Sequence, residues 1–157
     1  MSTTRTSAAS TSATSTNPRS LRDAPVDVKV VLSGLWVAML FVFAYVDIFG
    51  FWRADIVRGA LDGEVPGVGF EINQTFLVLT TLYVVVPSLM VAFSLLAPAR
   101  VSRPVTVGVA VGYLASVIAS MVGETWTYYL VGSTVEVVLL LMIARTAWSW
   151  PRGPMTA

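Results

Sequence analysis

Residues 30–52 read VVLSGLWVAMLFVFAYVDIFGFW, a long apolar run that contains one charged residue, Asp47. In an α-helix, which rises 1.5 Å per residue, about 20 residues cross a hydrocarbon core of about 30 Å. The run does not alternate between apolar and polar residues, as a strand of a membrane barrel would. It therefore predicts a membrane-spanning α-helix.

Three more apolar runs of similar length follow, at about 75–96, 105–122 and 125–148. Together the four runs predict an all-α fold, a transmembrane antiparallel four-helix bundle over residues 28–151. Residues 1–27 are rich in Ser, Thr and Ala, and we expect a disordered cytoplasmic tail there. Residues 152–157 form a short C-terminal tail. Between the first two spans, residues 54–61 predict a short extracytoplasmic helix, with a Gly-rich turn at 65–69.

Composition supports a membrane protein and excludes several kinds of site. Hydrophobic residues make up 55% of the 157 residues and charged ones only 12%, about half the share of a soluble domain. Cysteine and histidine are absent, which excludes disulfides and removes the commonest general base and metal ligand. We therefore expect no metal and no cofactor. The net charge of +1 gives no reason to expect nucleic acid, so the lipid bilayer is the first expected partner.

The basic residues predict the orientation of the bundle. With four crossings, eight of the ten fall on the side of both termini, where the positive-inside rule places the cytoplasm. They are Arg5, Arg19, Arg22, Lys29, Arg100, Arg103, Arg145 and Arg152. The protein is thus expected in the plasma (inner) membrane, with both termini cytoplasmic.

Two acids lie inside predicted spans: Glu136 near the middle of the fourth, and Asp47 near the outer end of the first. An ionised carboxylate at such depth is costly, so each should be protonated, paired or in contact with a wet cavity. A functional role is one interpretation. In the other, a protonated Glu136 forms a hydrogen bond that helps to hold the helices together.

Several polar residues lie at comparable depth and predict a candidate intramembrane polar site around the two acids. Tyr129 and Ser133 share a helical face with Glu136, at spacings of seven and three residues. The second span adds Thr80, Thr81 and Tyr83. These residues, with Asp47 and Glu136, would form a polar track from the outer surface inward between the first, second and fourth spans.

Two features concern helix packing. Gly108, Gly112, Ser116 and Ser120 form a stripe of small residues at every fourth position of the third span. Such a stripe lets helices approach closely, either within the monomer, which we favour, or in a dimer. Pro87 in the second span should leave a backbone carbonyl near Tyr83 without its helical partner. We expect neighbouring residues to satisfy that carbonyl.

The order of several short motifs resembles a family of small bacterial four-helix membrane proteins of uncharacterised function, over about residues 29–151. The motifs are Leu32-Ser33-Gly34-Leu35-Trp36, Tyr45-Val46-Asp47-Ile48-Phe49-Gly50, Pro87-Ser88-Leu89-Met90, Tyr128-Tyr129, Val135-Glu136 and Ala147-Trp148-Ser149-Trp150-Pro151. The resemblance implies an acid at the positions of Asp47 and Glu136, but no activity. The fold is also similar in outline to DoxX-type four-helix proteins.

Three functions are compatible with these residues. The first is a non-enzymatic membrane protein that binds or passes a proton, a cation or a small solute through Asp47 and Glu136. The second is an accessory or scaffold protein that forms a homo-oligomer or packs against another membrane protein through the small-residue stripe. The third, a lipid-acting enzyme, has the least support because only carboxylates and tyrosines are available as acids or bases.

Overall fold

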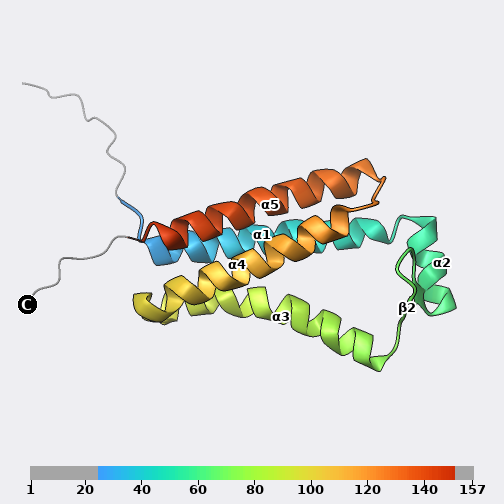
Figure 1. The fold of residues 1–157 in the computed structure, drawn as a ribbon, viewed down its shortest axis with the longest axis horizontal. Coiled ribbons are helices and arrows are strands. Elements are labelled where there is room, and N and C mark those ends of the chain that lie inside the picture. Colours follow the sequence, from blue (N-terminus) through green and yellow to red (C-terminus); the bar gives the residue numbers. More distant parts are fainter. Residues whose placement is uncertain (1–24, 151–157) are drawn as a thin grey trace, which may run out of the picture.

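A computed structural model describes residues 25–150, and the two predicted tails lie almost entirely outside this range. The described part contains four long helices and a short one (Figure 1). The long helices are α1 (Val28–Gly50), α3 (Gln74–Leu96), α4 (Ala99–Met121) and α5 (Thr127–Trp148). Each is long and apolar enough to cross a membrane. This confirms the all-α fold class and the four predicted spans.

The connection between α1 and α3 contains the short helix α2 (Ala54–Asp62), as predicted, and no residue of α2 is buried. A hairpin of two-residue strands follows, β1 (Glu64–Val65) and β2 (Phe70–Glu71), which the sequence did not predict. Its turn contains Gly67 and Gly69, both at positive φ, where glycine is favoured. The expected Gly-rich turn is therefore the tip of this hairpin.

Some helix ends differ from the predicted span ends, most of all at the start of α4. The third span was predicted from residue 105, yet α4 begins at Ala99, directly after Pro98. Arg100 and Arg103 thus lie within α4 and not in a loop. Hydropathy marks where a helix leaves the apolar layer, whereas capping decides where the helix ends. Accordingly, Asp27 caps α1 and Asn73 caps α3, each through a side-chain oxygen that accepts a backbone N–H bond.

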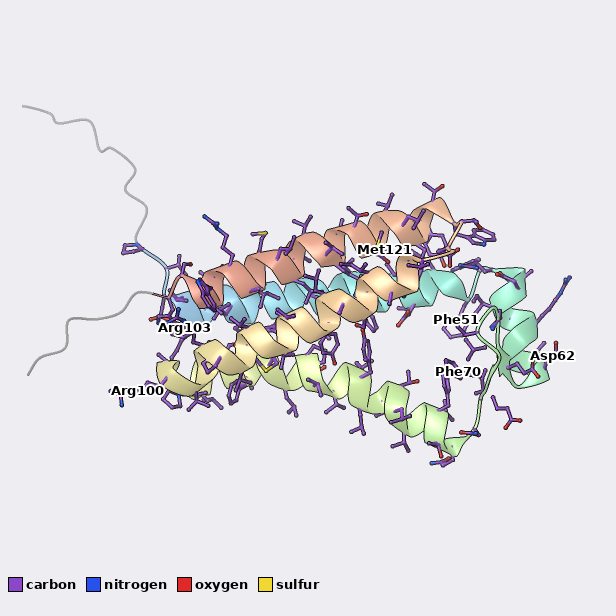
Figure 2. The ribbon with its side chains drawn as sticks, viewed as in Figure 1. Phe51, Asp62, Phe70, Arg100, Arg103 and Met121 are labelled. Atoms are coloured by element: carbon purple, nitrogen blue, oxygen red, sulfur yellow. The ribbon has the colours of Figure 1, made fainter. Side chains whose placement is uncertain are left out.

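The two ends of the bundle carry opposite kinds of charge. At the basic end, where α1 begins and α5 ends, lie Lys29, Arg100, Arg103 and Arg145. Figure 2 shows Arg100 and Arg103 there, and Asp62 at the opposite end with α2. Lys29 Nζ donates to the last turn of α3 at Leu95 O, 3.1 Å away, and Arg103 donates to Trp148 O of α5 at 2.8 Å. Both side chains place positive charge at a helix C-terminus, which is stabilising.

The apolar core is concentrated toward the basic end. It includes Leu32, Trp36 and Met39 from α1, Met90 from α3, Ala110, Tyr113 and Val117 from α4, and Leu140, Ile143 and Ala147 from α5. Helix α1 packs against α3 and α5, and α4 packs mainly against α5. Helix α3 diverges from the other helices toward the α2 end (Figure 1). The helices therefore pack closely around the core at the basic end, and α3 spreads away from them at the α2 end.

Pro87 of α3 has the expected consequence. Proline has no N–H, so the carbonyl of Tyr83, four residues earlier, lacks its usual helical partner. The Tyr113 hydroxyl of α4 donates a hydrogen bond to that carbonyl. A neighbouring side chain thus satisfies it, as predicted, and the bond joins α3 to α4.

This pairing predicts a dependence between two substitutions. Tyr113→Phe should lower the free energy of unfolding by about 1–2 kcal/mol, because it leaves a buried carbonyl without a partner. In a Pro87→Ala background the loss should be smaller, because the alanine N–H can bond to Tyr83 O. Unfolding by SDS in mixed micelles measures all four proteins of this double-mutant cycle. Equal losses in the two backgrounds would contradict the proposed role of the Tyr113 hydroxyl.

Candidate functional site

A cavity of about 230 Å³ lies between the four long helices, in the half of the bundle toward α2. Its lining contains both intramembrane acids and five hydroxyl-bearing side chains. The lining residues are Phe43, Val46 and Asp47 of α1, Tyr83 of α3, Ser116, Val117 and Ser120 of α4, and Tyr129, Ser133 and Glu136 of α5. The structure therefore brings together five of the seven residues predicted for the polar site.

The two carboxyl groups differ in their exposure. Glu136 lies in the middle of the third turn of α5, nine residues after Thr127, or about 14 Å along the helix. Its side chain is only 3% exposed, and Oε1 has no hydrogen-bond partner. Asp47 is exposed and lies one turn from the end of α1. The cavity thus has an acid at its open side and a second acid at its buried end.

The hydroxyl groups of Ser116 and Ser120 present oxygen lone pairs to the cavity. Ser116 Oγ donates to the Tyr113 carbonyl, and Ser120 Oγ donates to the Val117 carbonyl, both at 2.8 Å. Tyr83 Oη lies 2.6 Å from Ser116 Oγ. Because the Ser116 hydrogen is already used, Tyr83 is the donor in this contact. The oxygens of Ser116 and Ser120 can therefore accept hydrogen bonds or contact a cation, but they have no free hydrogen to donate. The hydroxyl groups of Tyr129 and Ser133 also line the cavity.

The structure does not bring Thr80 and Thr81 to the cavity. Both are exposed, and each bonds back to its own helix, Thr80 to Phe76 O at 2.9 Å and Thr81 to Leu77 O at 2.8 Å. The two threonines lie at the same depth as the acids, but they are not on the face of α3 that lines the cavity. Relative to Tyr83, which lines the cavity, they are rotated by about 60° and 160° about the axis of α3.

The glycines and the serines of the small-residue stripe of α4 lie in different environments. Gly108 and Gly112 are exposed, and a Cβ added at either would meet nothing within 4 Å. Ser116 and Ser120 instead line the cavity. A row at every fourth position turns by about 40° per step, so its ends face different directions. The glycines therefore form no seam within the monomer, contrary to our expectation, and the serines join the polar site, which sequence reasoning missed.

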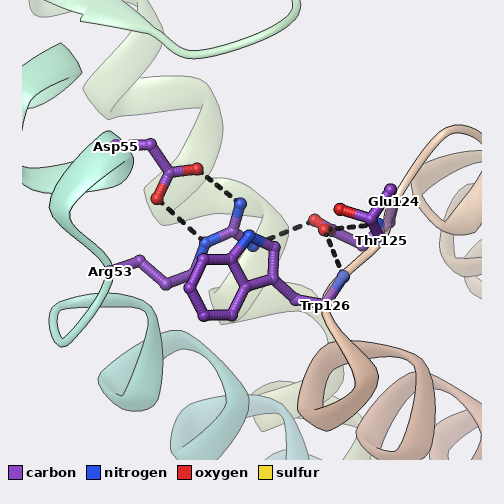
Figure 3. A network of polar contacts seen from close by, with 5 residues as sticks. All are labelled: Arg53, Asp55, Glu124, Thr125 and Trp126. Atoms are coloured by element: carbon purple, nitrogen blue, oxygen red, sulfur yellow. Dashed lines mark hydrogen bonds and ion pairs between the residues drawn. The ribbon is translucent and has the colours of Figure 1, made fainter.

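A cluster of ionic contacts at the α2 end joins the two connections nearest the cavity (Figure 3). Arg53, between α1 and α2, forms two hydrogen bonds to Asp55, at 2.7 and 3.2 Å, and one to Glu124 Oε2 at 3.0 Å. Its guanidinium also lies 4.7 Å from the ring centre of Trp126. Glu124 Oε1 accepts from the N–H groups of Thr125 and Trp126. Sequence reasoning missed this link, since 71 residues separate Arg53 and Glu124.

These contacts stabilise the charged forms of all three groups. The bond to Asp55 is the largest cause that raises the pKa of Arg53 above its ordinary value. The same bond lowers the pKa of Asp55. At Glu124 burial acts to raise the pKa, but the bonds from the Trp126 N–H, Arg53 and the Thr125 N–H together outweigh it, so the pKa is lowered. The cluster is therefore ionised at neutral pH and holds the first connection against the third.

Within residues 25–150 no group of three or more His, Cys, Asp or Glu side chains is placed to hold a metal ion. The cavity contributes two carboxylates, and its other oxygen atoms belong to Ser and Tyr. The arrangement can accept a proton, a small cation or a hydrogen-bond donor.

The fold and the cavity define a small helical protein with four helices able to cross a membrane and a polar cavity between them. The chain belongs to DUF6326, a family of unknown function, whose model matches residues 24–157. This confirms the resemblance to an uncharacterised family. No curated protein and no solved structure matches the chain, so the likeness to DoxX-type proteins is not shown.

The ionic cluster predicts a loss of stability in acid. Carboxylates whose pKa is lowered by folding stabilise the folded protein above their unfolded pKa, and this contribution is lost as the pH falls through the folded value. The loss should thus occur below about pH 4.5. Glu124→Gln should lower the free energy of unfolding by about 1 kcal/mol at pH 7 and weaken the acid dependence.

Thermal unfolding in detergent between pH 7 and pH 3 measures both effects. Asp62→Asn makes a comparable charge change on the exposed end of α2 and serves as the control. If Glu124→Gln and Asp62→Asn give the same acid dependence as the unchanged protein, the cluster does not contribute as described.

Proposed function

We propose that this protein is a multi-pass protein of the plasma membrane that binds a proton or a small cation in the cavity between its helices. The basic end faces the cytoplasm in this proposal, because Lys29, Arg100, Arg103 and Arg145 gather there. The cavity then opens toward the non-cytoplasmic side, with Asp47 at its entrance. The role is binding and not catalysis, since the lining offers no activated nucleophile.

The observation that carries the proposal is the Glu136 carboxyl group. It is buried, it lines the cavity, and one of its oxygens has no hydrogen-bond partner. A carboxylate in an apolar layer must be neutralised by a proton or by a cation. Arg, Lys and His are all missing from the cavity lining, so the neutralising charge has to come from outside the protein.

The packing of the other half of the bundle supports access from one side. Trp36, Leu140 and Ile143 fill the core toward the basic end, each with 0% of its surface exposed. A cation in the cavity thus meets a packed layer before it reaches the cytoplasmic side, and this layer also contains the buried hydroxyl groups of Ser94, Ser102 and Thr106. In this conformation the protein binds from the α2 side, and passage across the membrane requires a rearrangement of the helices or an oligomer.

Infrared difference spectra of the full chain in lipid vesicles test the proposal. A change of pH, or the addition of NaCl at fixed pH, should alter the carboxyl bands, because a proton or a cation reaches Glu136. Glu136→Gln should remove the component of this change that comes from the buried carboxyl group, whereas Glu71→Gln, on an exposed strand, should keep that component. A response that persists unchanged in Glu136→Gln would refute the proposed site, as would the absence of any response in the unchanged protein.

A second candidate function, that of an accessory or scaffold protein, is favoured by one observation. Gly108 and Gly112 lie exposed on α4, with open space where a side chain would be. A small-residue surface of this kind lets a helix of another membrane protein, or of a second copy, approach closely.

Gly112→Leu separates the two functions. It should abolish co-purification with a membrane partner or a second copy, because leucine holds the helices apart, while the stability of the monomer stays within about 1 kcal/mol. Crosslinking in native membranes followed by affinity purification is the measurement. Gly34→Leu changes an exposed glycine of α1 with equally open surroundings and is the control. An unchanged set of partners in Gly112→Leu would contradict the scaffold role.

A further inference from the structure

We propose that the cavity takes a small organic ammonium ion, a primary amine with a compact apolar body. This inference rests on the proposed function, because it specifies which cation the cavity binds. Three properties of the cavity support it: the type of polar atoms in the lining, the apolar part of the lining, and the size.

Four polar side chains of the lining favour a ligand that donates hydrogen bonds. Asp47 and Glu136 contribute carboxyl oxygens, and Glu136 Oε1 is buried without a partner. Ser116 and Ser120 use their hydrogens on backbone carbonyls and so offer only lone pairs. An ammonium group carries positive charge and three N–H donors, which matches two acids and nearby hydroxyl oxygens.

The same lining matches a divalent metal ion less well. Ca²⁺ takes six to eight oxygen ligands, usually with several carboxylates, and Mg²⁺ requires near-octahedral geometry. Two carboxyl groups line this cavity, and no cluster of three acidic, His or Cys side chains occurs within residues 25–150. An ammonium ion needs fewer oxygen partners than Ca²⁺ or Mg²⁺, so the two carboxyl groups and nearby hydroxyl oxygens are enough to bind it.

Apolar and aromatic side chains form the rest of the lining. Phe43 and Tyr83 contact each other with ring centres 5.7 Å apart, and Val46 and Val117 lie beside them. A fully hydrated inorganic ion gains nothing from these groups. The carbon body of an amine gains burial, and its charged end is attracted by aromatic faces.

The volume favours a molecule over a bare ion. The cavity of about 230 Å³ is several times the roughly 30 Å³ that one water molecule occupies in the liquid. A proton or a sodium ion would leave most of the space to water. An amine of about eight non-hydrogen atoms, such as benzylammonium, fills a space of this order with its charged end toward Glu136.

Calorimetric titration of the full chain in lipid nanodiscs tests the inference with benzylammonium and its neutral analogue benzyl alcohol. Benzylammonium should bind at least about tenfold more tightly than benzyl alcohol, because only the cation neutralises the buried carboxylate. Glu136→Gln should reduce this preference about tenfold or more, while Glu71→Gln should retain it. Phe43→Leu should weaken the binding of benzylammonium about threefold or more and leave the binding of methylammonium unchanged, because only the larger ion reaches the Phe43 ring.

The possible outcomes separate this inference from the proposed function. If benzylammonium binds no better than benzyl alcohol, or if Glu136→Gln and Phe43→Leu both bind it as the unchanged protein does, the inference is overturned. In that case a Glu136 infrared response to pH or NaCl still supports a proton or inorganic cation as the ligand. If that response is also absent, the proposed function fails together with the inference.

Discussion

Inside a hydrocarbon layer a backbone N–H or C=O finds no water, so each must find its partner within the protein. This constraint explains the hydrogen bond from Tyr113 to the Tyr83 carbonyl. Pro87 has no N–H to donate to that carbonyl, and the Tyr113 hydroxyl donates in its place. It also governs the hydroxyl side chains. Ser116 and Ser120 direct their hydrogens to carbonyls of α4, and what remains for the cavity is lone pairs. The same constraint that favours helices thus leaves these two serines as hydrogen-bond acceptors in the cavity.

Much of this architecture could be predicted from the sequence because hydropathy over 20 residues is a strong physical signal. The four spans, the helix α2 and the depth of Glu136 all follow from counting along the chain. What counting does not provide is the face toward which a side chain points. Thr80 and Thr81 lie at the depth of the two acids but on another face of α3. The two glycines of the small-residue stripe face outward, whereas its two serines face the cavity. Contacts between distant loops, such as Arg53 with Glu124, leave no local signal at all.

The two acids of the cavity lie in unlike surroundings, although both belong to apolar runs. Asp47 is exposed one turn from a helix end, whereas Glu136 is enclosed at mid-height. The cavity that they share is lined by α1 and α5, which pack closely together, and also by α3, which diverges from the bundle. Any movement of α3 would change the Tyr83 side of the cavity, while the acids on α1 and α5 would keep their places. Membership of DUF6326, a family of unknown function, leaves the chemistry of this cavity as the main guide to its role.

The packed core at the basic end has an electrical consequence. A membrane potential falls mainly across the part of a protein that excludes water, and here that part is the layer around Trp36, Leu140 and Ile143. With the cavity open toward the α2 side as proposed, an ion beside Glu136 has not yet crossed this layer, so the part of the voltage that falls there lies ahead of it. Moving one charge through the whole potential costs about 2.3 kcal/mol per 100 mV, and occupancy of the cavity would require only a part of this. Binding should therefore depend less on voltage than passage across the membrane does, and the energy of the field would act on any later step across this layer.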